Sequence, residues 1–302
     1  MKILVTGTNG LLGQKLSALL MKDDAVSPIL TARGKIHFPV TRGIVRSMDI
    51  TQREAVERVL IETQPDVVIN TAAMTLVDQC ETDQEACWMC NVKAVENLID
   101  GCEKINARLI HVSTDFIFSG ERGPLDENEK PGPVNFYGKS KAAAEELIMH
   151  SNLAWTILRT VLVYGITHDL GRSNIVLWVK ENLEKGKTIR VVNDQWRTPT
   201  LAEDLAMGCY LAATKKAQGV FNISGKDFMT PFDMAIKTAD FFKLDKSLII
   251  ATDSSQFKQT ARRPLRTGFI IDKAKKELGY QPRSFDEGLK ILSEQIPSSV
   301  QA

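Results

Sequence analysis

The stretch that decides the fold is Thr6-Gly7-Thr8-Asn9-Gly10-Leu11-Leu12-Gly13. It follows the apolar run Ile3-Leu4-Val5 and precedes leucines at helical spacing, so it joins an expected strand to an expected helix. In such a turn the glycines permit the tight bend, the approach of a pyrophosphate and close helix–strand packing. The N–H groups at the start of the helix then face the phosphate charge. The sequence therefore predicts a dinucleotide-binding turn formed by Gly7, Asn9, Gly10, Leu11, Leu12 and Gly13.

The first half of the chain continues this alternation of strand and helix. Val67-Val68-Ile69 and Leu109-Ile110-His111-Val112 are nearly continuous apolar runs, which are typical of parallel strands covered on both faces. A helix is expected around Ala55–Leu60, opened by a capping box of Thr51 and Glu54. A βαβ series with right-handed crossovers gives a doubly wound parallel sheet. The predicted class is α/β, of the Rossmann type.

The second half is less regular, and its expected elements lie at 188–192 and 219–224 for strands and at 201 onward, 272–279 and 284–295 for helices. Thr200 and Glu203 resemble a second capping box, and Thr230-Pro231 an N-cap followed by proline. No Gly/Ser-rich linker separates the halves. We therefore expect a smaller C-terminal substrate domain interwoven with the first. The expected division is 1–160 for the dinucleotide domain, with later segments near 188–225 returning to it, and 161–302 for the mainly substrate-binding part.

Charge and hydropathy exclude several classes of partner. The chain of 302 residues holds 38 Lys and Arg against 37 Asp and Glu, so no excess of positive charge indicates nucleic acid or an anionic membrane. No apolar run approaches the roughly 20 residues of a membrane span, and the N-terminal run is too short for a signal peptide, which favours the cytoplasm. The five cysteines include the pair Cys87-x-x-Cys90, for which we expect free thiols because no second pair or histidine accompanies it.

Tyr137 and Lys141 lie four residues apart in Tyr137-Gly138-Lys139-Ser140-Lys141, so a helix would bring them to one face. A nearby ammonium favours the tyrosinate and lowers a phenol pKa that is ordinarily about 10. On this argument Lys141 lowers the pKa of Tyr137, which can then exchange a proton near neutral pH. The same spacing is also common on solvated helix faces, so its meaning depends on what precedes it.

A polar run, His111-Val112-Ser113-Thr114-Asp115, ends an expected strand upstream of this pair. Ligands of open α/β sheets bind beyond the carboxyl ends of the strands, where a hydroxyl can donate a hydrogen bond to a substrate carbonyl. The glycine turn, the Ser-Thr pair and the Tyr-xxx-Lys pair in this order are far more specific than any one of them. We expect the ring of His111 to be satisfied within the strand, and the histidines show no spacing for a metal.

With these motifs the chain resembles the extended short-chain dehydrogenase/reductase family, and within it the dTDP-4-dehydrorhamnose reductase group. The matching stretches are TGTNGLLG, VVINTAAMTLVDQCE, HVSTDFIF, YGKSKAAAE, ILRTVLVYG, NDQWRTPTLAEDLA and RRPLRTGFIIDKAKKELGY. The segment NDQ-x-x-x-PT is the most discriminating, because sugar-nucleotide epimerases in general lack it. The resemblance implies the same fold and a nicotinamide-dependent oxidoreductase.

The resemblance also implies roles for single residues. Thr114 would orient a carbonyl, Tyr137 would donate the proton, and Lys141 would hold the nicotinamide ribose. The cofactor would be touched by Asp49 and Ile50 at the adenine and be lined by Ala72, Ala73 and Met74. The substrate would be bound by Thr114, Asp115, Asp194, Gln195, Trp196 and Arg197. Arg197 departs from the family's usual glycine, and Val161-Leu162 stand where a tryptophan is usual, so the exact sugar stays open.

The choice of cofactor depends on the end of the second strand, expected at about 26–30. An acid there often indicates NAD, but the chain continues Thr31-Ala32-Arg33 without a carboxylate. Arg33 can pair with a 2′-phosphate, which favours NADP, while NAD stays open if Arg33 is only a loop cation. Arg262, Arg263 and Arg266 allow two interpretations in the same way, as a solvated loop or as a clamp for a substrate diphosphate.

The favoured function is reduction of a nucleotide-linked 4-keto sugar. A sugar-nucleotide epimerase or dehydratase is an alternative, weakened for the dehydratase because Phe116 follows Asp115 where that group carries a second acid. A non-catalytic, dinucleotide-binding regulatory subunit is another alternative, because the regulatory subunit of methionine adenosyltransferase resembles the same group. A homodimer is left open.

Overall fold

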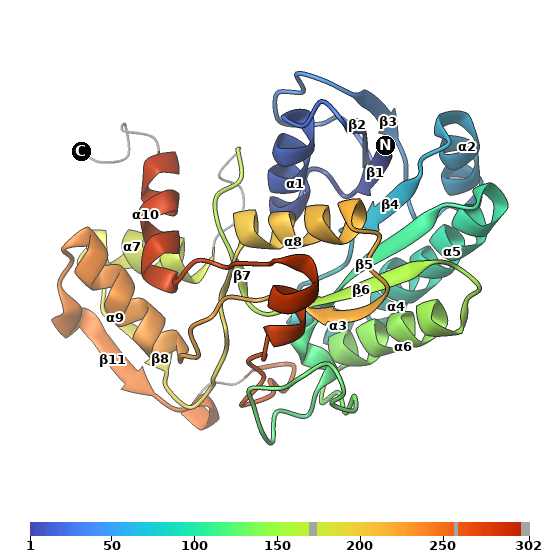
Figure 1. Cartoon of the computed structure of the whole chain (residues 1–302). Coiled ribbons are helices and arrows are strands. Elements are labelled where there is room, and N and C mark those ends of the chain that lie inside the picture. The colour runs from blue at the N-terminus through green and yellow to red at the C-terminus, as the bar shows by residue number, and fades with distance from the viewer. Residues whose placement is uncertain (169–173, 257–258, 297–302) are drawn as a thin grey trace.

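A seven-stranded parallel sheet forms the centre of the molecule (Figure 1). The computed structural model describes residues 1–168, 174–256 and 259–296. In spatial order the strands are β10 (Gly219–Asn222), β6 (Trp155–Thr160), β5 (Arg108–Thr114), β4 (Val67–Asn70), β1 (Lys2–Thr6), β2 (Ser27–Ala32) and β3 (Ile44–Ser47). The order reverses between β1 and β4, which is the switch point at which doubly wound sheets bind ligands. The Rossmann-type α/β fold expected from the sequence is confirmed.

Helices cover both faces of this sheet, as Figure 1 shows. One face packs against α1 (Leu11–Met21), α8 (Ala202–Thr214) and a π-helical turn at Ala274–Leu278. The other packs against α2 (Arg53–Thr63), α5 (Ala94–Ile105) and α6 (Phe136–His150). Short elements complete this side: α3 (Val77–Thr82), α4 (Gln84–Trp88), a π turn (Met89–Lys93) and a 3-10 turn (Asp115–Ile117). Because both faces are covered, the central strands are apolar on both sides.

A smaller lobe holds the remaining elements. Its helices are α7 (Ile175–Glu184), α9 (Pro231–Phe242) and α10 (Phe285–Gln295), and its strands are β8 (Ile189–Val192), β11 (Ile249–Thr252), β7 (Val163–Tyr164) and β9 (Thr200–Leu201), with 3-10 turns at Lys246–Leu248 and Ser254–Gln256. β8 pairs with β11, and β7 pairs with β9, each in a two-stranded sheet. Two apolar clusters of its own, one around Met234 and Leu289 and one around Val179 and Ala239, form its core.

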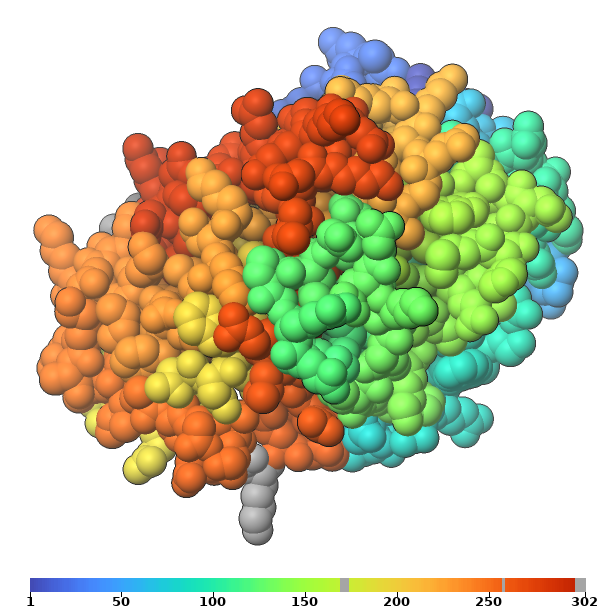
Figure 2. All heavy atoms as spheres, turned by 60° about the horizontal axis from the view of Figure 1, so that its bottom comes forward, coloured from blue at the N-terminus to red at the C-terminus, as the bar shows by residue number. Residues whose placement is uncertain are grey.

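The two parts are interwoven along the chain. β10 and α8 come from the second half yet belong to the central sheet and its cover, whereas β8, also expected to return, pairs with β11 in the smaller lobe. The segment after Phe118 and the late segment around Gly268 lie side by side (Figure 2). The N–H of Leu125 donates to the carbonyl of Gly268, and the N–H of Ile270 donates to the carbonyl of Leu125. The domain division at residue 160 stays a prediction.

Two of the expected capping boxes are wrong. α2 begins after Gln52, and Thr51 instead donates its hydroxyl to Asp49. α8 begins after Leu201, because Thr200 donates to the carbonyl of Val161 in the buried core. The capping pattern at Thr230 is confirmed, as a box with Asp233, and Ser284 caps α10 in the same way. A local hydrogen bond to Asp49 therefore outcompetes the capping signal at Thr51, and a tertiary one to Val161 does so at Thr200. Within the described ranges, no helix is long and apolar enough to cross a membrane.

Candidate active site

Glycines let the turn after β1 pack closely against the loop after β4 and against the start of α1. Gly7 has φ +64°, and a Cβ built on it would lie 2.8 Å from Cα of Ala72. At Gly13 a Cβ would lie 2.4 Å from the carbonyl oxygen of Gly7, so only glycine lets α1 start this close to the strand. No side chain caps α1 at Gly10. The first N–H groups of the helix, including those of Leu11 and Leu12, are thus left for an anion, which is the donor set that a dinucleotide pyrophosphate needs.

The expected adenine side lies on the loops after β2 and β3. Asn9 ties the glycine turn to the loop after β2, because it donates to the carbonyl of Lys35 and accepts the N–H of His37. Arg33 follows β2 directly, is exposed, and forms no ion pair within the described ranges. The Asp49 carboxylate accepts the N–H and hydroxyl of Thr51. The fold thus brings the residues predicted at 33 and 49 to one edge of the sheet, but their contact with a cofactor stays a prediction.

The loop after β4 faces the glycine turn and is held by residues that sequence reasoning missed. The Thr6 hydroxyl oxygen accepts the N–H groups of Thr71 and Ala72, each at 3.2 Å. Asn91 holds Met74 by both main-chain groups, at 2.8 Å to its N–H and 3.0 Å to its carbonyl. Asn91 lies in the π turn at Met89–Lys93, and such turns often occur at functional sites. No motif marks Asn91, because its partners come from α6 and the β4 loop.

Tyr137 is placed by the first turn of α6. The side chain of Asn135 caps this helix by accepting the N–H of Gly138 at 2.8 Å. Gly138 is needed here because a Cβ would lie 2.1 Å from the carbonyl oxygen of Phe116. The turn therefore packs directly on the 3-10 turn that follows Thr114. Tyr137 and Lys141 share the buried side of α6, so the expected common face is confirmed.

Burial decides the proton affinity of Tyr137. Burial raises the pKa of the phenol well above its ordinary value, and only a hydrogen bond with Thr114 acts in the other direction. The expectation that Lys141 lowers the pKa of Tyr137 is therefore wrong for this structure. A high pKa keeps the phenol protonated at neutral pH and at the same time makes it a weaker acid.

The amine of Lys141 is held by β5. Its Nζ lies 2.7 Å from the carbonyl oxygen of Val112 and 2.8 Å from Nε2 of His111. Burial lowers the pKa of Lys141 to about 8, against the opposing charge of Glu145. The ring of His111 is satisfied at both nitrogens, as expected, with Asn70 on the other side. Its contact with Lys141 was not foreseen, because it joins a strand and a helix distant in sequence.

The expected substrate segment after β8 contains one residue that is bonded within the protein and two residues that hold buried polar atoms without a partner. Arg197 is buried, and its guanidinium donates to the main-chain carbonyls of Trp196, Pro264 and Leu265. Its Nε also lies 3.5 Å from the buried carboxylate of Asp115. Most donors of Arg197 are thus used within the protein, where the side chain ties two segments together, and its contact with a substrate stays a prediction. Within the described residues, Asp194 Oδ1 and Gln195 Nε2 are buried without a hydrogen-bond partner and keep capacity for a ligand.

The three late arginines do not act as one cluster. Arg263 forms a bidentate ion pair with Asp78 of α3. Arg266 lies 5.3 Å from the ring of Trp196 and 5.5 Å from that of Phe228, so it is stacked on an aromatic pair. Arg262 is exposed, whereas the other two are half-buried. The interpretation of all three as a single diphosphate clamp therefore gains no support from this geometry.

The cysteines of the chain form no metal site or disulfide in the described ranges. All five cysteines are free thiols, four of them buried, and the described ranges hold no group of three His, Cys, Asp or Glu residues that could bind a metal.

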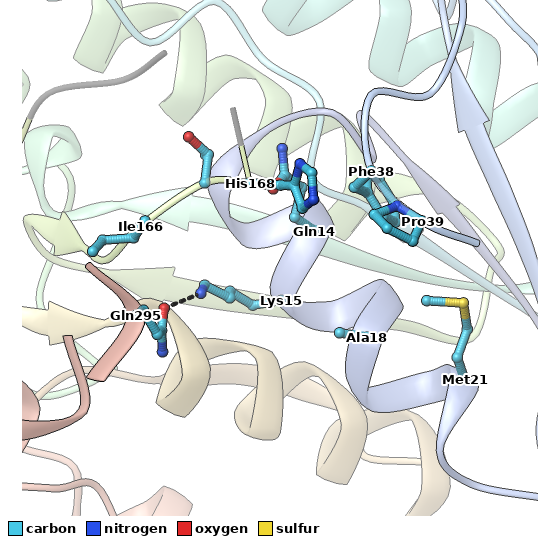
Figure 3. Close-up of a pocket in the computed structure, with 10 residues that line it drawn as sticks. Gln14, Lys15, Ala18, Met21, Phe38, Pro39, Ile166, His168 and Gln295 are labelled. Atoms are coloured by element: carbon cyan, nitrogen blue, oxygen red, sulfur yellow. Dashed lines mark hydrogen bonds between the residues drawn. The ribbon is translucent and has the colours of Figure 1, made fainter. Parts of the chain in front are cut away.

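A hollow of about 390 Å³ lies on the flank of α1, lined by Lys15, Phe38 and His168 (Figure 3). Figure 3 shows Lys15 reaching Gln295 of α10 across it. None of Thr114, Tyr137 and Lys141 lines this hollow.

Comparison with known proteins identifies the family of this chain. A family model described as the RmlD substrate binding domain matches residues 1–297. The chain belongs to this family. It is therefore one of the extended short-chain dehydrogenase/reductases, as its motifs indicated, and an oxidoreductase of that type.

Three similar proteins illustrate the range of the family. A probable low-salt glycan biosynthesis reductase of Haloferax volcanii is 31% identical over 95% of this chain and 96% of its own length. The methionine adenosyltransferase 2 subunit beta of Mus musculus is also 31% identical, over 82% of this chain and 73% of its own. The crystal structure of dTDP-4-dehydrorhamnose reductase of Bacillus anthracis in complex with NADP has a TM-score of 0.84 at 25% identity, covering 97% of this chain and 99% of that one.

Proposed function

We propose that the protein reduces a nucleotide-linked 4-keto sugar with NADPH. The observation that carries this proposal is the placement of Tyr137 and Lys141 on the buried face of α6 that packs on β5, with Thr114 at the carboxyl end of that strand, next to the switch point with its glycine turn. Ligands of doubly wound sheets bind at this place. The sugar, its base and the role of Tyr137 as proton donor belong to the proposal.

The chemistry divides between cofactor and protein. When bound, the dinucleotide supplies a hydride to the keto carbon. Tyr137 then gives its phenolic proton to the carbonyl oxygen. Burial raises the pKa of Tyr137, so the phenol is protonated before this transfer. Thr114 orients the carbonyl, and the water-poor surroundings strengthen each of these hydrogen bonds.

The cofactor-side residues support NADP. The glycine turn and the uncapped start of α1 suit the pyrophosphate. The exposed guanidinium of Arg33, which has no ion pair within the described ranges, is available for a 2′-phosphate. A relative of known structure binds NADP. Lys141 would hold the nicotinamide ribose, and the predicted contacts of Asp49, Ile50, Ala72, Ala73 and Met74 complete the site.

A first prediction tests the cofactor. Arg33→Ala should weaken NADPH binding by about 1–3 kcal/mol and leave NADH nearly unchanged, because only NADPH carries the 2′-phosphate. Binding of both cofactors is measured by fluorescence titration. Equal losses for NADPH and NADH would show that Arg33 does not read this phosphate.

The proposed reaction is tested by incubating the protein with NADPH and a panel of nucleotide-linked 4-keto sugars. Oxidation of NADPH with formation of the hydroxy sugar supports the proposal. The likeness to methionine adenosyltransferase 2 subunit beta favours one other candidate, a regulatory subunit that binds the dinucleotide without turnover. Tight NADPH binding with no reduction of any sugar, together with a partner enzyme that copurifies, would decide for that candidate.

A further inference from the structure

A chain of buried hydrogen bonds connects Lys141 to the start of the glycine turn. Lys141 Nζ lies 2.8 Å from His111 Nε2, and His111 Nδ1 lies 3.1 Å from Asn70 Nδ2. Asn70 Oδ1 lies 2.6 Å from Thr6 Oγ1. These four side chains, on β1, β4, β5 and α6, are at most 2% exposed. We call them the β1–α6 chain.

The polarity of this chain is fixed at its far end. A main-chain N–H can only donate, and the N–H groups of Thr71 and Ala72 both point to Thr6 Oγ1. A hydroxyl has two lone pairs and one hydrogen, so these two bonds use its lone pairs. The hydrogen of Thr6 must therefore go to Asn70, which has to turn its amide oxygen toward Thr6.

The remaining links follow from this orientation. With its oxygen toward Thr6, Asn70 presents its NH2 group to His111, whose Nδ1 must accept. A neutral imidazole that accepts at Nδ1 carries its hydrogen on Nε2, so His111 donates to Lys141. An ammonium has three donors and no acceptor, so only the neutral amine of Lys141 can accept this hydrogen. The amine keeps hydrogens to donate to the carbonyl of Val112.

We propose that His111, oriented through Asn70 and Thr6, is a positioning residue that stabilises the proton-accepting amine of Lys141. Protonating Lys141 turns its bond with His111 into a contact between two donors, so the β1–α6 chain raises the cost of the ammonium. This proposal adds a positioning residue to the proposed reductase site, and the role of His111 in catalysis rests on that proposed function. A lysine near its own midpoint at working pH can both take up and release protons.

The other charged groups around Lys141 do not remove this effect. Glu145, one turn further along α6, favours the ammonium, but both of its oxygens are bonded to the guanidinium of Arg159. Cys87 of α4 adds a smaller effect in the same direction, and the buried phenol of Tyr137 stays neutral. Burial and Lys141 hold the pKa of His111 well below its ordinary value, which agrees with a neutral ring.

The tautomer of His111 tests the proposal directly. Long-range 1H–15N correlation spectra of the 15N-labelled, dinucleotide-free full chain at about pH 9 distinguish the two ring nitrogens. The sequence holds only four histidines, and the signals lost in His111→Gln assign this ring. We expect hydrogen on Nε2 and none on Nδ1. Hydrogen on Nδ1 would overturn the proposal, whether or not the protein reduces any sugar.

The second measurement follows the 15Nζ signal of Lys141 against pH. Asn70→Asp should reverse the chain, because a carboxylate accepts both from Thr6 and from Nδ1–H, leaving Nε2 to accept from an ammonium. The midpoint of Lys141 should then rise by at least about one pH unit, a tenfold change in the protonation equilibrium. His111→Gln is the control without added charge, because its amide can offer an oxygen, and it should also raise the midpoint. An unchanged midpoint in both variants would overturn the proposal, while the reductase activity is judged separately by the sugar panel.

Discussion

At the scale of single residues, burial determines what the candidate catalytic groups can do. Tyr137 and Lys141 are nearly inaccessible to solvent, and the charged form of each is therefore disfavoured. A protonated phenol and an amine with a pKa of about 8 place a donor and an exchangeable base on the same buried side of α6. This pairing suits the reductive direction, in which the site has to supply a proton.

A prediction follows for the hydroxyl of Tyr137. Tyr137→Phe removes one oxygen and should leave the packing against Phe116 and the binding of NADPH unchanged. The loss of general acid catalysis should lower kcat by about 10²–10⁴-fold, with little change in substrate binding. Turnover of a 4-keto sugar nucleotide is compared with NADPH binding in the same variant. Turnover at the wild-type rate would show that another group is the acid.

Arg197 leads to a different prediction, of stability. Arg197→Ala leaves the buried carboxylate of Asp115 without its cation and the carbonyl of Pro264 without its donor, whereas the carbonyls of Trp196 and Leu265 keep a main-chain donor each. Removing one partner of a buried ion pair costs about 3–5 kcal/mol, so the free energy of unfolding in urea should fall by this order. Arg197→Lys keeps the charge and should lose less. A variant as stable as the wild type that fails only in sugar binding would instead make Arg197 a substrate ligand.

At the scale of elements, the start of α6 connects the two halves of the site. Asn135 caps the helix through its oxygen and, through its nitrogen, donates to the carbonyl of Arg262 at 2.7 Å. One side chain thus fixes the turn that carries Tyr137 and the late segment that borders the substrate side. The carbonyl oxygen of Phe116 lies against Gly138, which leaves this turn no room to shift.

Two variants separate these two roles of Asn135. Asn135→Ala removes both bonds and should lower stability by about 0.5–2 kcal/mol, with a fall in kcat because Tyr137 is less firmly placed. Asn135→Asp keeps the capping oxygen but replaces the donor to Arg262 by an acceptor that repels the carbonyl of Arg262. It should therefore keep α6 capped and kcat near the wild-type value, lose some stability at the contact with the late segment, and raise KM for the sugar nucleotide. Thermal unfolding and steady-state kinetics measure both, and identical behaviour of the two variants would contradict the division.

At the scale of the whole molecule, the late segment 261–267 is bonded to the dinucleotide-binding part. Arg263 and the N–H of Ala261 both bond to the carboxylate of Asp78 on α3. The same segment continues to Arg266 and Thr267, and the hydroxyl of Thr267 reaches Asp115 beside Thr114. The late segment is thus bonded to α3 at the edge of the candidate site and to Asp115 at its centre.

Breaking the outer link should affect substrate more than fold. Asp78→Asn removes an ion pair whose partners are 49% and 18% exposed, so the loss of stability should be about 1 kcal/mol or less. KM for the sugar nucleotide should rise while the Kd of NADPH stays the same, because only the late segment is loosened. Asp286→Asn breaks the pair with Lys237 inside the smaller lobe and is the matched control. Equal changes in KM for both variants would assign no role to the link at Asp78.

The sequence by itself determined the central architecture and the identity of the candidate groups. The glycine turn, the apolar strands and the pair Tyr137 and Lys141 are local patterns, and each imposes its structure through steric room or periodicity within a few residues. Only the tertiary structure decided which group faces which. It buried Arg197 against Asp115, directed Lys141 to His111 instead of toward Tyr137, and gave Thr200 a core carbonyl instead of a helix N-terminus. These contacts join segments 30 or more residues apart, and their energies depend on burial, which no short stretch of sequence specifies.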